Sequence, residues 1–483
     1  MSDVFGASDR LLVRLAANTV VHAAGTGFGS LISFFTFVAV ARGLGPDSYG
    51  DYTASLAFIT IPVVLVDIGL STAVVRYLAG DPDRTERVIR TTVPIRALAT
   101  AAVVAAIIGV AAVAPFSDQT KLGILIGSLG AVALLVTGTV FPLFQVRLSL
   151  QWVVLANLAG RIVTLALTLA ALSAGYGFEG VVWANVAGLW GAALLALAAA
   201  SRFTSLRPIV DLGESRRMVA GAVALALAVG LAQVYMRLDA VLLALLRTEY
   251  EVGIYGAAWK FIDVAGFAAG AVSVTVLPAL SRFAATNDPR LRTMASRALD
   301  VMLAAGVPVA VLLGALAPEI IRLTAGAEFR EGATALRILA AYVPMMFVTM
   351  LLWNIIIARG ADRTLLKLGL ATVVANVALN LALIPAFGYR GAASAALGSE
   401  ALSLFLGLLA VHRLQALPSV GYLRVVLPAS LLMALVLVAF PGPAAVTAVA
   451  AVAVYGAVIA LAPGTGRDAV QKISSTVRTS ARA

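Results

Sequence analysis

The sequence contains no cysteine and only two histidines, His22 and His412, which lie near opposite ends of the chain. The absence of cysteine excludes disulfide bonds, thiolate metal sites and cysteine nucleophiles. A metal site or a catalytic triad built on histidine would need partner residues that are hard to find in this sequence. We therefore expect no metal and no other cofactor.

Charged residues are also scarce. Asp, Glu, Lys and Arg make up 12% of the 483 residues, whereas hydrophobic residues make up 61%. A soluble domain is about 25% charged and about 45–50% apolar. A water-soluble fold could not bury this much apolar surface, so the composition predicts an integral membrane protein.

The net charge is +11, but its distribution argues against a nucleic-acid partner. A nucleic-acid interface is one dense basic face, often with aromatic residues between the cations. Here the basic residues are mostly arginines in short connectors between apolar runs. This distribution is typical of cytoplasmic loops that hold Lys and Arg on one side of a membrane.

Long apolar runs account for nearly all of the chain. A membrane-spanning helix needs about 20 apolar residues, and in lipid an apolar run must satisfy its own backbone hydrogen bonds. The runs lack the alternation of a β-barrel. The first, from about Leu15 to Ala41, is longer than the core of a signal peptide, about 7–15 residues, and we expect it to be retained. The sequence thus predicts an all-α polytopic membrane protein with about fourteen transmembrane helices, centred near Phe28, Val63, Val103, Ala133, Leu165, Leu189, Ala228, Ala268, Val309, Phe347, Ala375, Leu402, Leu432 and Ala451.

The arginine-rich connectors predict the orientation. With the N-terminus in the cytoplasm, the inner connectors carry most of the basic residues, and both termini are cytoplasmic. An odd number of spans would instead place the basic C-terminal tail outside. Within the outer connector Glu319–Arg337 we expect a short amphipathic helix. The inner basic residues include Arg84, Arg87, Arg90, Arg96, Arg202, Arg207, Arg216, Arg217, Arg282, Arg290, Arg292, Arg297, Arg359, Arg363 and Lys367.

An internal repeat relates the two halves of the chain. Tyr49–Phe58 aligns with Val252–Phe261, so that Gly50 corresponds to Gly253, and Gly177–Gly188 aligns with Gly388–Ser399 at nearly the same offset. Six spans fit in one period, so both copies have the same orientation, as in parallel transporter repeats. This predicts two six-helix pseudo-symmetric lobes around a central cavity. We assign residues 1–207 to the N-lobe, 208–416 to the C-lobe, 417–463 to an accessory hairpin and 464–483 to a basic cytoplasmic tail.

Several short motifs occur in order at comparable depths of the predicted spans. They are Ala41–Pro46 followed by Tyr49-Gly50, Asp67–Leu70 with Arg76, Arg237–Asp239, Val252–Tyr255 with Ala258, and Gly388–Gly391. As an ordered set they resemble the polysaccharide flippases (O-antigen, Wzx-type) of the multidrug/oligosaccharidyl-lipid/polysaccharide exporter superfamily.

The resemblance implies a transporter in the cell (plasma or inner) membrane. It would flip polyprenyl-diphosphate-linked oligosaccharide from the inner to the outer leaflet for surface polysaccharide assembly, and the parallel repeat adds alternating access as its mechanism. Its partners would be the lipid-linked oligosaccharide, membrane lipids and, in the same assembly process, a polysaccharide polymerase and glycosyltransferases.

Five ionisable residues lie inside predicted spans, where charges usually face a cavity or one another. They are Arg161, Arg237, Asp239, Lys260 and Asp263. We expect Arg237 and Lys260 at a common depth, about 14 Å below the outer surface at 1.5 Å per residue. In one interpretation the cations bind the diphosphate or acidic sugars of the substrate. In the other, the two aspartates neutralise Arg237 and Lys260 and hold the hairpin together.

A sixth ionisable residue, Asp67, lies near the inner end of the second span, within the stretch Arg42–Arg76. We favour a structural role for Asp67, paired with Arg76 or Arg87. Coupling of Asp67 and Arg76 to transport is the alternative. A proton or Na⁺ gradient could also act through Asp239 or Asp263.

Other functions remain open from the sequence. A multidrug antiporter of the same superfamily generally relies on an acid in the first span, but Asn18–Ala41 contains neither Asp nor Glu. A flippase for the peptidoglycan lipid precursor fits the pattern almost as well. A membrane polymerase or glycosyltransferase would need acid/base groups in extramembrane loops, and only Glu319–Arg337 has acids close together. We therefore expect a transporter and not an enzyme. The sequence has no P-loop motif, so we do not expect direct coupling to ATP.

Overall fold

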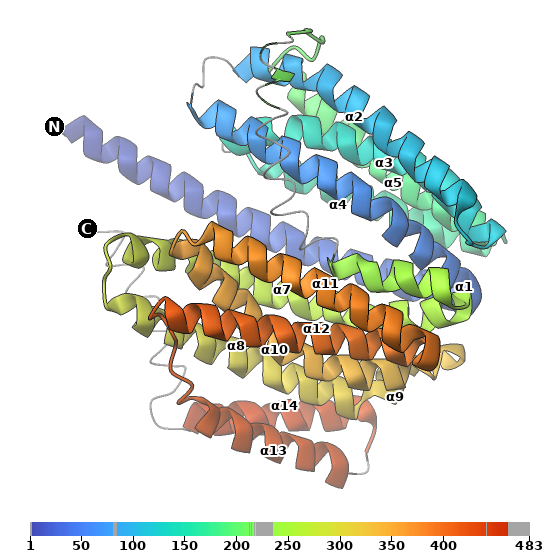
Figure 1. Cartoon of the computed structure of the whole chain (residues 1–483), viewed down its shortest axis with the longest axis vertical. Coiled ribbons are helices and arrows are strands. Elements are labelled where there is room, and N and C mark those ends of the chain that lie inside the picture. Colours follow the sequence, from blue (N-terminus) through green and yellow to red (C-terminus); the bar gives the residue numbers. More distant parts are fainter. Residues whose placement is uncertain are drawn as a thin grey trace. The chain divides into compact units, whose positions relative to one another are not determined.

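A computed structural model of the chain describes residues 2–80, 85–147, 149–211, 235–440 and 442–461, together with residues 213, 215, 216 and 218. The described residues form helices joined by short loops, with no strand among them (Figure 1). The predicted tail, residues 464–483, lies outside the described residues.

The first helix, α1 (Ser2–Gly80), contains the first two predicted spans. It bends at Gly45, whose φ of 73° and ψ of 174° are not helical. A residue with a Cβ rarely adopts a positive φ, and Pro46 favours an extended conformation at the position before it. The bend therefore lies in the Gly43–Pro46 segment because of these two residues.

The other helices account for the remaining spans, and the predicted fold class is confirmed. Residues 235–246 are the described helical part of the seventh span. Eleven described helices are long and apolar enough to cross a membrane. The short α9 (Ala317–Thr324) and the 3₁₀ turn η2 (Ala327–Phe329) lie in the connector where a short helix was expected. Besides α1, the spanning helices are α2 (Thr85–Val113), α3 (Asp118–Val146), α4 (Gln151–Ser173), α5 (Gly177–Ala200), α7 (Glu249–Ala285), α8 (Arg290–Ala315), α10 (Gly332–Ala358), α11 (Asp362–Phe387), α12 (Tyr389–Arg413) and α14 (Ala444–Leu461). Helix α13 (Leu423–Ala439) is a shorter apolar helix.

The chain divides into two compact units, Met1–Gly256 and Ala257–Ala483. In the first, α3 packs against α1, α2 and α5, and α4 packs against α1 and α5. In the second, α10 packs against α8 and α12, α12 packs against α11, and α13 joins α14 to α8 (Figure 1). The lobe boundaries given above remain a prediction, since the first unit also includes the start of α7.

The two units repeat the same helix pairings. The contacts α2 with α3, α3 with α5, and α4 with α5 match α8 with α10, α10 with α12, and α11 with α12. The helix pairs α4–α5 and α11–α12 also turn alike, because Gly177 and Gly388 have φ values of 50° and 56°. These are equivalent positions in the sequence repeat, so the structure supports its second alignment.

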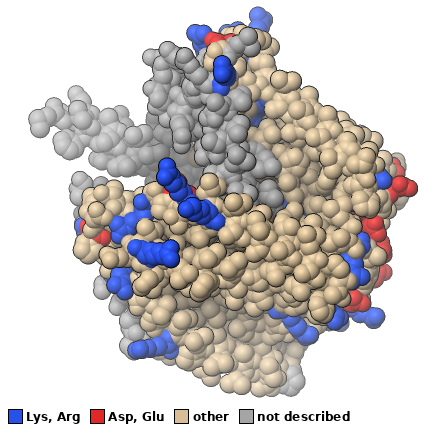
Figure 2. Space-filling model, in the orientation of Figure 1, with Lys and Arg blue, Asp and Glu red and all other residues tan. Residues whose placement is uncertain are grey.

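Apolar side chains form both the core and most of the surface. The largest fully buried side chains include Tyr49, Phe144, Tyr255 and Phe347, while Val113 and Val438 are more than 80% exposed. On the face shown in Figure 2, Lys, Arg, Asp and Glu side chains gather mainly near helix ends. Such a band of uncharged surface between charged helix ends suits a membrane.

Candidate functional site

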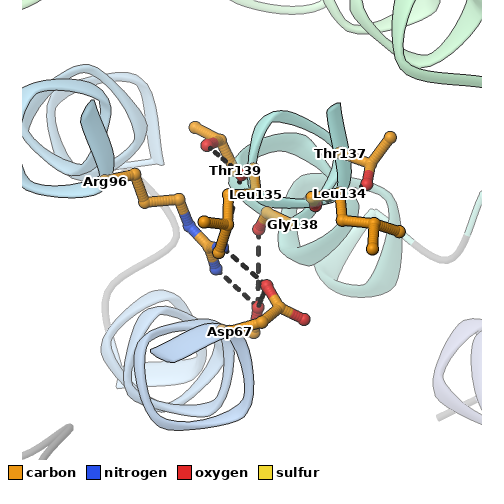
Figure 3. A network of polar contacts seen from close by, with 8 residues as sticks. Asp67, Arg96, Leu134, Leu135, Thr137, Gly138 and Thr139 are labelled. Atoms are coloured by element: carbon orange, nitrogen blue, oxygen red, sulfur yellow. Dashed lines mark hydrogen bonds and ion pairs between the residues drawn. The ribbon is translucent and has the colours of Figure 1, made fainter. Parts of the chain in front are cut away.

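An arginine buried inside the first unit forms a polar network with two neighbouring helices (Figure 3). Arg96 of α2 is 2% exposed, and its side chain reaches between α1 and α3. Its Nη1 donates to Asp67 Oδ1 at 2.6 Å and its Nη2 donates to Ser71 Oγ at 2.6 Å. The Leu135 carbonyl oxygen lies 3.4 Å from Nη1. Three helices are therefore joined by one guanidinium group.

The network needs a glycine on the facing helix. A Cβ added to Gly138 of α3 would lie 2.0 Å from Asp67 Oδ1 and 2.4 Å from Arg96 Nη1. Such contacts are far inside van der Waals distance. Gly138 therefore allows α3 to approach the ion pair closely.

These contacts correct one of the two expected partners of Asp67, Arg87. Arg87 pairs instead with Asp211 at 2.7 Å, and the side chain of Arg76 lies outside the described residues. Asp67 pairs with Arg96, which had been counted among the connector arginines. Because α2 begins at Thr85, Arg96 lies three turns inside a helix.

Arg161 of α4 binds the first half of α1. Its Nη1 donates to the Gly29 carbonyl oxygen at 2.7 Å and to Ser33 Oγ. Its side chain is half-buried. The contacts explain how a mid-span arginine is held against a neighbouring helix.

Asp239 is buried in the helical segment 235–246. It is 3% exposed and accepts a hydrogen bond from Tyr255 Oη at 3.0 Å. Arg237, two residues earlier, is half-buried. The carboxylate of Asp239 thus has a hydrogen-bond partner within the first unit.

Lys260 and Asp263 lie one turn apart on α7 in the second unit. Their charged atoms are 3.6 Å apart, and their side chains are 40% and 27% exposed. This contact agrees with the predicted neutralisation of Lys260 by Asp263. The grouping of Arg161, Arg237 and Lys260 in one cavity stays a prediction, because the last of these belongs to the other unit.

Two further buried acids were not singled out from the sequence. Asp51 is 4% exposed and accepts hydrogen bonds from Ser117 and from Thr120 Oγ1, so it binds the start of α3. Glu400 of α12 is also 4% exposed. In the sequence, each of these two residues is marked only as an acid within an apolar run. That signal alone does not separate a helix-capping acid from a functional one.

Gly50 and Gly253, which the repeat aligns, pack against each other. A Cβ on Gly50 would lie 1.8 Å from the Glu249 carbonyl oxygen, and one on Gly253 would lie 2.0 Å from the Pro46 carbonyl oxygen. Pro46 and Glu249 each precede their glycine by one helical turn. The contact is therefore reciprocal, as expected for equivalent segments related by a two-fold axis. These residues all belong to the first unit.

Two protein-family models match the chain. The model described as polysaccharide biosynthesis protein matches residues 15–284, and the model described as lipid II flippase MurJ matches residues 153–463. Two curated proteins of Haloferax volcanii are also similar. The probable low-salt glycan biosynthesis flippase Agl15 is 25% identical over 36% of this chain and 37% of its own length. The probable flippase AglR is 25% identical over 39% of this chain and 40% of its own length. Each alignment thus spans well under half of its relative.

Solved structures share the fold. Lipid II flippase MurJ in an inward closed conformation has a TM-score of 0.78 at 16% identity, over 91% of this chain and 98% of that one. An inward-facing multidrug resistance MATE transporter has a TM-score of 0.65 at 16% identity, over 80% of this chain and 94% of that one. The polysaccharide biosynthesis model covers more than half of the residues, and its match agrees with the helical fold and the paired repeats. The chain therefore belongs to the polysaccharide biosynthesis protein family, the flippase family of the multidrug/oligosaccharidyl-lipid/polysaccharide exporter superfamily.

Proposed function

We propose that this protein flips a polyprenyl-diphosphate-linked oligosaccharide from the cytoplasmic to the outer leaflet of the cell membrane, for assembly into a surface polysaccharide. The observation that carries the proposal is the family match. Models for polysaccharide biosynthesis proteins and for a lipid II flippase together cover residues 15–463. Both named relatives from Haloferax volcanii are probable flippases as well.

The intramembrane cations supply a physical reason for an anionic substrate. A diphosphate group offers several charged oxygens, with which Arg can form bidentate contacts and Lys a point-charge contact. Lys260 is suited to this role because its side chain is 40% exposed and its contact with Asp263 is long, at 3.6 Å. We infer that the substrate diphosphate competes with Asp263 for Lys260, and that Arg161 and Arg237 add positive charge.

The parallel repeat supports alternating access. In transporters with such repeats, one half rocks against the other about a fixed substrate site. The reciprocal contact of Gly50 and Gly253 supports the repeat on which this mechanism rests.

Topology and coupling complete the proposal. We propose that both termini are cytoplasmic, because the connectors on that side carry most of the arginines. Flipping would be coupled to a proton or Na⁺ gradient through a membrane acid such as Asp239 or Asp263. The protein would work beside a polymerase and glycosyltransferases without catalysing a reaction itself.

Transport of the peptidoglycan lipid precursor is the second candidate. The lipid II flippase model matches residues 153–463, and the MurJ fold aligns over 91% of the chain. Both candidate substrates are lipid-linked diphosphates, so they differ only in the glycan. The likeness to multidrug transporters extends to the fold alone, and the first span has no acid between Asn18 and Ala41.

Depletion of the protein in its native host separates these candidates. We expect lipid-linked oligosaccharide to accumulate on the inner leaflet and surface polysaccharide to fall, while peptidoglycan synthesis continues. Accumulation of the peptidoglycan precursor with cell lysis would identify the second candidate instead. Unchanged surface polysaccharide with no accumulated intermediate would refute the main proposal.

A further inference from the structure

An apolar groove runs along the first unit, and none of the residues proposed above as substrate contacts lines it. Its volume is about 540 Å³. Helix α3 forms its floor with Val132, Val136 and Val140, α2 forms one wall, and Leu197 of α5 stands opposite. Leu206, in the segment after α5, closes one end.

The closed end of the groove is rich in arginine. Arg90 Nε of α2 donates to the Arg207 carbonyl oxygen at 2.9 Å, and the Ile209 amide donates to the Arg90 carbonyl oxygen at 3.1 Å. These two hydrogen bonds hold the segment around Leu206 against α2. The arginines at this end are Arg87, Arg90, Arg147, Arg202 and Arg207, and the described acids that pair with them are Glu86 and Asp211.

Three of these cations are available to an anion. Arg147, Arg202 and Arg207 are exposed and form no ion pair within the described part of the chain. Arg147 and Arg202 lie over the rings of Phe203 and Trp152, which hold them at this end. Among the described residues, the positive charge therefore exceeds the negative charge where the apolar groove ends.

Arg96 also lines the groove. It is 2% exposed, and its Nε has no hydrogen-bond partner among the described residues. Arg96 is six residues beyond Arg90, about 9 Å further along the helix. An unmet buried donor is costly, so an acceptor carried by a ligand at this depth would stabilise it.

We propose that the groove binds one anionic glycerophospholipid. An acyl chain would occupy the apolar part, the phosphate would lie among Arg147, Arg202 and Arg207, and an ester carbonyl would accept a hydrogen bond from Arg96. Basic pockets between membrane helices bind anionic head groups in this way. A polyprenyl phosphate fits less well because it has no carbonyl next to its phosphate. The site differs from the proposed substrate site, so it does not depend on the substrate.

Native mass spectrometry of the delipidated full-length protein tests the site. The probes are phosphatidylglycerol, phosphatidylcholine with the same acyl chains, and a polyprenyl phosphate. The test variant is Ala101→Trp, because Ala101 is exposed on α2 and lines the groove. The matched control is Ala102→Trp, at the next position, which is exposed but does not line it.

We expect the wild type to retain one phosphatidylglycerol in preference to the other two probes. Ala101→Trp should weaken this binding roughly tenfold, the change expected for displacing about two methylene groups. Ala102→Trp should leave it unchanged. Arg207→Gln should reduce the preference over phosphatidylcholine about fivefold. Equal retention of both phospholipids, or equal weakening by the two tryptophan variants, would mean that the retained lipid only surrounds the protein without a specific site. Either result would overturn the proposal. Preferred binding of the polyprenyl phosphate would overturn the assigned occupant.

Discussion

Replacing Asp67 by alanine should destabilise the first unit strongly, because it leaves the buried Arg96 without its carboxylate. Removing one partner of a buried ion pair costs about 3–5 kcal/mol. The Asp67 side chain is 36% exposed whereas that of Arg96 is 2% exposed. Water can reach the carboxylate but not the guanidinium group, so we expect the lower end of the range, about 3 kcal/mol.

A double-mutant cycle separates the charge pair from its surroundings. Asp67→Leu with Arg96→Met removes both charges and should lie within about 1 kcal/mol of the wild type, since apolar replacement of a buried pair is often neutral. Ser71→Ala removes one hydrogen bond to Arg96 and should cost about 1 kcal/mol. The expected coupling energy between the two charged residues is about 2 kcal/mol or more.

The assay is chemical unfolding of the purified protein in detergent micelles, followed by circular dichroism. Membrane abundance of each variant serves as an independent readout. An Asp67→Ala variant within about 0.5 kcal/mol of the wild type would refute the reasoning, because surface changes fall in that range. A double variant less stable than Asp67→Ala would also refute it.

Three further predictions concern the repeat, the substrate cations and the topology. Gly253→Ala should lower the free energy of unfolding by about 1–3 kcal/mol, because its Cβ would lie 2.0 Å from the Pro46 carbonyl oxygen. Gly270→Ala on the same helix has open space at its Cβ and should not lower it. Thermal unfolding compares the two variants, and equal effects would contradict the close crossing. Arg237→Ala and Lys260→Ala should abolish transport at normal membrane abundance, as scored by surface polysaccharide, and normal transport in both would exclude the cation hypothesis. Reporter fusions should place both termini in the cytoplasm, and opposite sides would indicate an odd number of spans.

The helices were predictable because their cause is local. Apolar runs of membrane-spanning length must be helical in lipid, and Gly45 with Pro46 breaks α1 for reasons visible in two adjacent residues. The contact between Lys260 and Asp263 was equally predictable from the sequence, since the two residues are one turn apart on one helix.

The partner of Asp67 was not predictable, because it depends on how three helices pack. Charged residues near the ends of spans were assigned to the connectors. However, α2 begins at Thr85, so Arg96 lies inside the helix and is buried in the unit. The choice of Arg96 also requires Gly138, which lies on a third helix. Neither residue is near Asp67 in sequence. The contacts of Arg161 with Gly29 and Ser33 are non-local in the same way.

Reconstitution of the purified protein into liposomes tests the central claim most directly. The vesicles would carry a fluorescent polyprenyl-diphosphate oligosaccharide in both leaflets, and an impermeant quencher would reach only the outer one. With the active protein we expect the quenched fraction to rise from about half towards completion, and with Lys260→Ala we expect no rise above protein-free vesicles. Identical quenching with and without the protein, under imposed proton and Na⁺ gradients, would contradict the account.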